Sequence, residues 1–313
     1  MHERAASWFR GRSSTWRDWP VERVLADKAR LNSRISLIIP ARNEAGTVAD
    51  IVATLSRTLQ KDAPLLDEII VIDSDSTDDT AGVAARAGAI VYRASEIATD
   101  LGTRPGKGEA LWKSLFVAGG DLLVFVDGDL TEWGPHFVTG LLGPLLADDD
   151  VQLVRAAYTR IRAGMDGTVT PDGGRLTELV ARPLLSLYWP ELTAVAQPLA
   201  GEWAVRRGLL ETLAIPVGYG VELSTLLDTA ARHGLDAIAQ VHLGQRAHRH
   251  RTDRDMALAA TELLAVAESR RGRAATGPVR LQQFDLTADG WGHPVSRRVD
   301  LDERPPVTAA RPA

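Results

Sequence analysis

Hydrophobic and polar positions along the first half of the chain separate strands from helices. Unbroken apolar runs lie at 35–39 (ISLII), 68–73 (EIIVID) and 122–126 (LLVFV), and such runs are typical of strands buried on both faces of a parallel sheet. Residues 48–55 instead place apolar side chains at the helical period of about 3.6 residues, which predicts a helix. Strands that alternate with helices at this spacing predict an α/β fold with right-handed crossovers.

The pattern changes from about residue 159. A glycine-rich loop at 164–174 precedes a helical stretch at 175–188, which Pro183 should kink or divide. The other elements that the sequence predicts are strands at 89–92, 151–158 and 237–243 and helices at 80–87, 110–117, 135–146, 219–227 and 256–269.

Composition narrows the class of protein without identifying it. The chain has 313 residues, of which 45% are hydrophobic and 25% are charged, and it has no cysteine. These values predict a globular protein with ample core and exclude disulfides and cysteine nucleophiles. No apolar run approaches the ~20 residues of a membrane span, so we expect a cytoplasmic protein without stable membrane insertion. The net charge of −5 gives no general attraction to nucleic acid.

Two carboxylates follow the buried run at 122–126. Asp127 and Asp129 are two residues apart, so in extended backbone both can face one cation or one ribose, while Gly128 lets a ligand approach closely. Hard oxygen ligands in this arrangement suit Mg²⁺ or Mn²⁺ that bridges to phosphates. Asp-Gly-Asp is also a common turn sequence, and the motif alone leaves both interpretations open.

Two further places in the sequence are suited to anions. Lys107 lies between Gly106 and Gly108 just ahead of a predicted helix, where free N–H groups and a positive charge suit a phosphate; a tight turn with a solvated lysine is the alternative. Arg175 and Thr177 follow the glycine-rich loop and are suited to hold a small carboxylate or phosphate. A capped helix with an exposed arginine is the alternative there.

The run 246–251 (RAHRHR) brings imidazoles and guanidinium groups together. Neutral His248 is suited to be a third metal ligand, for Mn²⁺ as well as for Mg²⁺. Without an acidic metal site, the same run would be a solvated basic surface.

Four segments come together if the predicted parallel sheet forms: 40–44, Asp73, 106–107 and 127–129. Three of them follow strands, so they share the edge at which open α/β sheets bind ligands. Acidic groups there suit the donors of a base and a ribose, and a lysine with a metal suits a diphosphate. The sequence therefore predicts a nucleotide site at this edge.

These motifs resemble a known family. The segments that resemble the nucleotide-sugar half of GT-A glycosyltransferases are IIPARNE at 38–44, VIDSDSTDDT at 71–80, RPGKGEALW at 104–112 and VDGDL at 126–130. A narrower resemblance, to the retaining glucosyl- and mannosyl-3-phosphoglycerate synthases of glycosyltransferase family 81, is carried by GGRLTELVARPLL at 173–185, QPLAGE at 197–202, GYGVE at 218–222 and GLDAIAQVHLGQRAHRH at 234–250. The resemblance covers about residues 35–270.

The resemblance implies a GT-A fold, a mainly parallel sheet with helices on both faces, and transfer of a hexose from a nucleotide-diphosphate sugar to the 2-hydroxyl of 3-phosphoglycerate. Asp129 and His248 would ligate Mg²⁺ or Mn²⁺, and Asp129, Glu222 and Lys107 would be catalytic. The implied nucleotide-sugar site is Pro40, Arg42, Glu44, Asp73, Gly106, Lys107, Asp127, Gly128, Asp129 and Glu222. The implied acceptor site is Gly174, Arg175, Thr177, His250 and Arg251.

Retention of configuration admits two mechanisms. We expect front-face substitution, in which the leaving phosphate accepts the proton, in preference to covalent attack by Glu222. No single residue decides among UDP-glucose, GDP-glucose and GDP-mannose. The alternatives are a GT-A transferase with another small or lipid-linked acceptor, a nucleotidyltransferase, which would need a glycine- and arginine-rich loop where this chain has ARNE, and a non-catalytic nucleotide-sugar-binding protein.

The patterns divide the chain into four parts. Residues 1–33 are expected as an arm whose aromatic side chains pack onto the domain or a partner subunit, 34–158 as the nucleotide-sugar-binding subdomain, 159–272 as the acceptor-binding subdomain and 273–313 as an extended, proline-rich tail. The arm and the tail would suit a homodimer.

Overall fold

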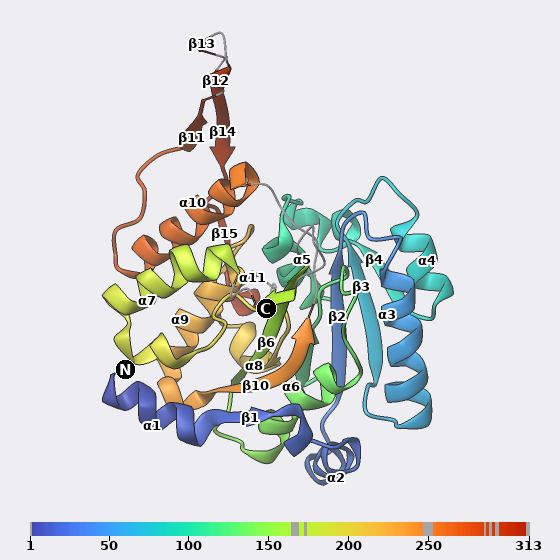
Figure 1. Cartoon of the computed structure of the whole chain (residues 1–313). Coiled ribbons are helices and arrows are strands. Elements are labelled where there is room, and N and C mark those ends of the chain that lie inside the picture. The colour runs from blue at the N-terminus through green and yellow to red at the C-terminus, as the bar shows by residue number, and fades with distance from the viewer. Residues whose placement is uncertain are drawn as a thin grey trace.

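The computed structural model describes residues 2–163, 169–171, 174–246, 253–284, 286–287, 290–291 and 294–310. One mixed sheet lies at its centre (Figure 1). The strands are β1 (Ser13–Thr15), β2 (Ile35–Ala41), β3 (Glu68–Asp73), β4 (Ile90–Arg93), β5 (Leu122–Phe125), β6 (Leu153–Ala163), β7 (Val169–Pro171), β8 (Trp203–Arg206), β9 (Ile215–Pro216), β10 (Ile238–Arg246), β11 (Val279–Gln283), β12 (Leu286–Thr287), β13 (Gly290–Trp291), β14 (Val295–Val299) and β15 (Glu303–Arg304).

The order of the central sheet is β1-β10-β6-β8-β5-β2-β3-β4, with β7 paired to β6. β2 is parallel to both β3 and β5, and β3 is parallel to β4. On the other side, β6, β10 and β1 are also parallel to one another, and β8 runs antiparallel between β5 and β6. The sheet is therefore mainly parallel, and the predicted α/β fold class is confirmed.

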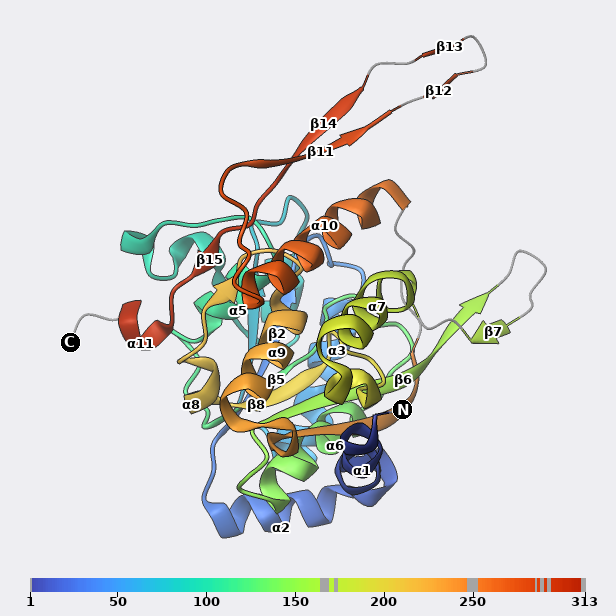
Figure 2. The same cartoon turned by 90° about the vertical axis from the view of Figure 1, so that its left-hand side faces the viewer.

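Helices cover both faces of the sheet (Figures 1 and 2). They are α1 (Glu3–Arg12), α2 (Val21–Leu31), α3 (Val48–Leu55), α4 (Thr80–Arg86), α5 (Lys107–Ser114), α6 (His136–Ala147), α7 (Arg182–Tyr188), α8 (Arg207–Leu210), α9 (Val221–His233), α10 (Asp253–Arg270) and α11 (Val307–Ala310).

The two faces of the strands belong to two separate hydrophobic clusters. Ile38 of β2 packs in one cluster with α5 and α9, whereas its neighbours Leu37 and Ile39 pack in the other with α3 and α6. Because successive side chains of a strand point to opposite faces, a continuous apolar run is what a sheet covered on both sides requires. This explains why the runs at 35–39, 68–73 and 122–126 do not alternate.

The N-terminal segment packs onto the domain. β1 adds a parallel strand beside β10, and the buried Trp8 donates a hydrogen bond of 2.8 Å from Nε1 to the Ile238 carbonyl. Trp8 and Trp19 of this segment are therefore buried against the body of the chain, whereas Phe9 is exposed. The boundary at 158/159 falls inside β6, and the division into subdomains stays a prediction.

The C-terminal segment is more ordered than an extended tail. β11 and β14 form an antiparallel hairpin that projects from the body (Figures 1 and 2). The chain then returns: β15 pairs with β9, Arg304 Nη2 lies 2.6 Å from Glu109 Oε1, and Trp112 Nε1 donates to the Pro305 carbonyl at 2.8 Å. None of the helices in the described part of the chain combines the length and apolar character needed to cross a bilayer.

Candidate active site

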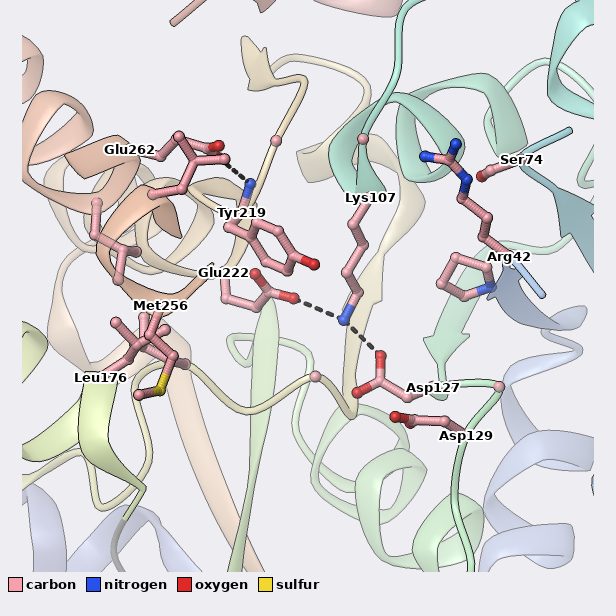
Figure 3. Close-up of a pocket in the computed structure, with 18 of the residues that line it drawn as sticks. Arg42, Ser74, Lys107, Asp127, Asp129, Leu176, Tyr219, Glu222, Met256 and Glu262 are labelled. Atoms are coloured by element: carbon pink, nitrogen blue, oxygen red, sulfur yellow. Dashed lines mark hydrogen bonds and ion pairs between the residues drawn. The ribbon is translucent and has the colours of Figure 1, made fainter. Parts of the chain in front are cut away.

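A cavity of about 690 Å³ opens where β2 and β5 end. The starts of α5 and α9, the end of β10 and one side of α10 complete its wall, and Figure 3 shows Lys107, Asp127 and Glu222 converging in it. The predicted site residues that line the cavity are Pro40, Arg42, Glu44, Gly106, Lys107, Asp127, Gly128, Asp129, Gly174, Arg175, Thr177 and Glu222. The structure therefore brings these predicted donor and acceptor residues to one cavity, while their roles stay predictions.

Lys107 joins the two acidic sides of the cavity. Its Nζ lies 2.5 Å from Asp127 Oδ1 and 2.8 Å from Glu222 Oε1. Burial alone would lower the pKa of Lys107, but the charges of Asp127 and Glu222 outweigh it and raise the pKa. Lys107 is therefore a fixed cation at neutral pH, held at the first position of α5.

The approach of the Lys107 loop to its neighbours requires glycine. Gly106 has a φ of +134°, and a Cβ there would lie 2.2 Å from the Val217 carbonyl oxygen. A Cβ on Gly108 would lie 1.8 Å from the Pro216 carbonyl oxygen. Both glycines thus let the start of α5 touch the backbone that leads into α9.

Asp127 is held from both sides. Arg246 Nη2 lies 2.9 Å from Asp127 Oδ2, while Lys107 takes Oδ1. Burial would raise the pKa of Asp127, but the positive charges of Lys107 and Arg246 hold that pKa well below its ordinary range. Both oxygens of Asp127 are therefore engaged by cations of the chain itself.

Beneath this pair lies a fully buried carboxylate. Arg246 Nη2 is 3.0 Å from Glu202 Oε1, and Arg246 Nη1 donates to Tyr158 Oη at 2.8 Å. Burial raises the pKa of Glu202 to about 7, against the opposing influence of Arg246. Arg246 thus links Glu202 to the Asp127–Asp129 pair.

Asp129 is the carboxylate best placed for a cation. Its Oδ1 lies 3.9 Å from Arg246 Nη2, outside hydrogen-bonding range, and its side chain is 31% exposed at the cavity wall. A hard cation bound to a nucleotide commonly takes one or two carboxylates and completes its shell with phosphate oxygens, so the residues present fit such an ion. Within the described residues, no group of three or more histidines and carboxylates surrounds a common point. His248, the other predicted ligand, lies outside the described residues.

The loops at the strand tips form the remaining donor side. Thr47 Oγ1 donates to the Gly128 carbonyl at 2.6 Å, and the Glu44 backbone N–H donates to Thr80 Oγ1 at 2.8 Å. Asp73 is buried and is not part of the cavity wall; its carboxylate accepts a hydrogen bond from Ser76 Oγ. Asp73 therefore acts on the loop beside the cavity, and a direct contact with a nucleoside stays a prediction.

Three predicted acceptor residues lie at or just before the start of a π-helical segment, η5 (Thr177–Ala181): Thr177 begins it, and Gly174 and Arg175 precede it. Gly174, Arg175 and Thr177 line the cavity, and Figure 3 shows Leu176 beside Met256 of α10. His250 and Arg251, the other predicted acceptor residues, lie outside the described residues.

Several residues of this site had no role predicted from the sequence. Arg246 and Glu202 lie in the segments 234–250 and 197–202 that carried the family resemblance, which was the available signal. Arg246 lines the cavity, as do Tyr219, Glu262, Arg298 and Asp300, whereas Glu202 is fully buried behind it. Arg298 and Asp300 come from the segment expected as a tail, where sequence carried no signal.

The fold and the site define a glycosyltransferase of the GT-A type. The family model "Glycosyl transferase family 2" matches residues 36–179. The chain belongs to the glucosyl-3-phosphoglycerate synthase family, as its overall similarity to the members below establishes.

The similarity extends over nearly the whole chain. The glucosyl-3-phosphoglycerate synthase of Mycolicibacterium smegmatis is 44% identical over 97% of this chain and 98% of its own length. The crystal structure of the Mycobacterium tuberculosis enzyme with Mn²⁺, UDP-glucose and phosphoglyceric acid is 41% identical, with a TM-score of 0.84 over 96% of this chain and 99% of its own. The same enzyme with Mg²⁺ and UDP is 43% identical, with a TM-score of 0.83 over 94% and 96% of the two chains.

Proposed function

We propose that this protein transfers glucose from UDP-glucose to the 2-hydroxyl of 3-phosphoglycerate with retention of configuration, in the presence of Mg²⁺ or Mn²⁺. The observation that carries the proposal is the double ion pair of Lys107 with Asp127 and Glu222. It fixes the donor side and the sugar side of one cavity around a single cation. The ligands named for the M. tuberculosis structures support this choice of donor, acceptor and metal.

The donor would lie along the strand tips. The nucleoside would contact Pro40, Arg42 and Glu44 at the end of β2, and the diphosphate would lie near Lys107 and the start of α5. The lysine suits such a group, whereas the N–H groups of Gly108 and Glu109 at the start of α5 are taken by the Gly218 and Val217 carbonyls. Asp127, already held by two cations, would be rigid enough to accept a hydrogen bond from the ribose.

A divalent cation, when bound, neutralises negative charge that develops on the departing diphosphate. Asp129 would hold it together with His248. Lys107 adds a second positive charge that the protein has already placed, so it needs no rearrangement during the reaction.

The environment of Glu222 favours a binding role over a nucleophilic one. Glu222 Oε1 lies 2.8 Å from Lys107 Nζ, and the Glu222 side chain is almost fully buried. A carboxylate in this ion pair can orient sugar hydroxyl groups, but its lone pairs are less available for attack on carbon. We therefore infer front-face substitution, in which the leaving phosphate accepts the proton of the acceptor hydroxyl. A glycosyl adduct trapped on Glu222 would overturn this inference.

The acceptor would enter from the side of η5 and α10. Gly174, Arg175 and Thr177 would hold its phosphate or carboxylate, with His250 and Arg251. The acceptor and the nucleoside would then lie on opposite sides of Lys107, and the two substrates would meet at Glu222.

The test of the proposed function is direct. Purified protein is incubated with 3-phosphoglycerate, Mn²⁺ or Mg²⁺, and UDP-glucose, GDP-glucose or GDP-mannose in turn, and the product is identified by mass spectrometry. We expect glucosyl-3-phosphoglycerate from UDP-glucose at the highest rate. Binding of the donors without turnover would favour a non-catalytic binding protein, and turnover only with another acceptor would favour a different GT-A transferase.

We also propose that the chain forms a homodimer. The β11–β14 hairpin projects from the body (Figure 2) and is tied to it at α10, where Arg297 Nη1 lies 3.0 Å from Asp255 Oδ1. Phe284, which follows β11, has 58% of its surface exposed. Sedimentation equilibrium should give twice the chain mass, and Phe284→Ser should shift the equilibrium toward monomer; a monomer at all concentrations would contradict the proposal.

A further inference from the structure

The backbone that carries Glu222 into the cavity is held between two helices. On the side of α5, the Gly108 N–H donates to the Gly218 carbonyl at 3.3 Å, and the Glu109 N–H donates to the Val217 carbonyl at 3.1 Å. α9 then begins at Val221. We call the segment 217–220 the approach loop. It leads directly into α9, which carries Glu222, and it accepts hydrogen bonds from the start of α5, which carries Lys107.

On its other side, the approach loop rests against α10. Glu262 Oε2 accepts the backbone N–H of Tyr219 at 2.5 Å (Figure 3). A Cβ on Gly218 would lie 2.1 Å from this same oxygen, and a Cβ on Gly220 would lie 2.5 Å from Val266 Cγ2. The backbone of the approach loop is therefore in direct contact with the side chains of Glu262 and Val266 on α10.

Glu262 is not needed to dock α10 on the rest of the protein. Its neighbours Leu263, Val266 and Ala267 are buried in the same hydrophobic cluster as α9. Farther along α10, Arg270 Nη2 forms an ion pair of 2.9 Å with Asp228 of α9. Apolar contacts and this ion pair hold α10 in place. The Glu262 carboxylate, by contrast, has a desolvation cost, because only 9% of the residue's surface is exposed.

We propose that Glu262 is a positioning residue for the transfer reaction: by holding the Tyr219 N–H, it fixes the start of α9 and so the ion pair of Glu222 with Lys107. The inference rests on the proposed function, because it assigns Glu262 to that same site. Displacement of a catalytic group by about 1 Å can lower a rate about 100-fold. A carboxylate acceptor is suited to this task because hydrogen bonds to charged groups are stronger than neutral ones.

Two substitutions at Glu262 separate its hydrogen bond from its volume and charge. Glu262→Gln keeps an oxygen that can accept the Tyr219 N–H, and we expect its kcat to stay within about threefold of the wild type, the change expected when a charged acceptor becomes a neutral one. Glu262→Ala leaves the N–H without its acceptor, and we expect kcat to fall about 10- to 100-fold. Binding of UDP with Mn²⁺, measured by calorimetry, should change much less than kcat for either variant, because the proposed nucleoside contacts at Pro40, Arg42 and Glu44 lie at the end of β2 and not on the approach loop.

An independent substitution attacks the same contact from the loop. Gly218→Ala introduces a Cβ into the position of Glu262 Oε2 and should displace the carboxylate without removing it. The Gly218→Ala and Glu262→Ala losses should then be strongly non-additive in the double variant, since both remove one contact. Asp228→Ala is the matched control: it removes the ion pair that docks α10 but leaves the Tyr219 contact, and its kcat should match the wild type.

Hydrogen exchange gives a readout that does not depend on turnover. The amides of residues 218–222 should exchange faster in Glu262→Ala than in the wild type. In Glu262→Gln and Asp228→Ala, they should exchange at the wild-type rate. Equal kcat and equal exchange for Glu262→Ala and the wild type would overturn the inference. A wild type that makes no product from any donor would instead overturn the proposed function, while the exchange comparison would still decide whether Glu262 holds the loop.

Discussion

Asp127 and Arg246 form an ion pair of 2.9 Å at the base of the cavity, and Lys107 takes the second oxygen of the same aspartate at 2.5 Å. The first aspartate of the Asp-Gly-Asp motif is therefore satisfied by the protein, while Arg246 Nη2, the cation paired with the second among the described residues, lies 3.9 Å from Asp129 Oδ1, outside hydrogen-bonding range. The two carboxylates are alike in sequence but differ in what they can do. This difference leads to the first prediction.

Asp129→Ala should abolish metal-dependent transfer with little effect on stability. We expect a loss of turnover on the order of 100-fold or more, because the cation would lose its carboxylate ligand. The free energy of unfolding should change by less than about 1 kcal/mol, since the Asp129 side chain is 31% exposed and lies 3.9 Å from its ion-pair partner Arg246. The measurements are initial rates against Mn²⁺ concentration and urea unfolding. Wild-type turnover that persists in excess EDTA would contradict the assignment.

Lys107→Met should lower both activity and stability. The substitution leaves the nearly buried Glu222 without its cation, and removal of one partner from a buried ion pair costs on the order of 3 kcal/mol. Loss of a positive charge beside the diphosphate should lower kcat about 100-fold. Lys61→Met, at an exposed lysine, is the control and should change neither. Normal turnover by the Lys107→Met protein would remove Lys107 from the mechanism.

The pH dependence of stability should report on Glu202. Its pKa is raised from the ordinary 4.5 to about 7 by burial, so between these values the folded state binds more protons than the unfolded state. Stability from this group is therefore complete below pH 4.5 and falls as pH rises through 7, by on the order of 3 kcal/mol in total. Urea unfolding of the wild type and Glu202→Gln from pH 5 to 8 checks this. The glutamine variant should lack that part of the slope; identical slopes would contradict the raised pKa.

Much of the site could be predicted because strand ends in a parallel sheet share one edge. Asp127, Asp129 and Lys107 were expected together on that ground, and they line one cavity. The same prediction included Asp73, which also ends a strand but is not part of the cavity wall, because its carboxylate accepts a hydrogen bond from Ser76 Oγ in the following loop. Strand register places a Cα atom, whereas local hydrogen bonds decide where its side chain points.

The residues that sequence analysis missed are brought in by packing between distant helices and strands. Glu262 reaches the approach loop only because α10 lies against α9, and Arg298 reaches the cavity from a hairpin that was expected to be tail. The hydrophobic periodicity of a single segment does not predict such contacts between distant elements. The sequence predicts the sheet edge because hydrogen-bonded strands fix it; it does not predict which later elements cover that edge.

The contact between α5 and the approach loop leads to a last prediction. Gly108→Ala would place a Cβ 1.8 Å from the Pro216 carbonyl oxygen, a backbone atom that cannot move aside alone. α5 must then shift, and the shift should destabilise the fold by about 1–3 kcal/mol. It should also displace Lys107, so that kcat falls even at a temperature where the variant is fully folded. Gly11→Ala, at a helical glycine with open space around its Cβ position, is the control and should be neutral or slightly stabilising. The measurements are the thermal unfolding midpoint and kcat at 20 °C below the variant's midpoint. A stable, fully active Gly108→Ala protein would mean that the contact between Gly108 and Pro216 does not position Lys107, because a shift of the start of α5 must also move Lys107.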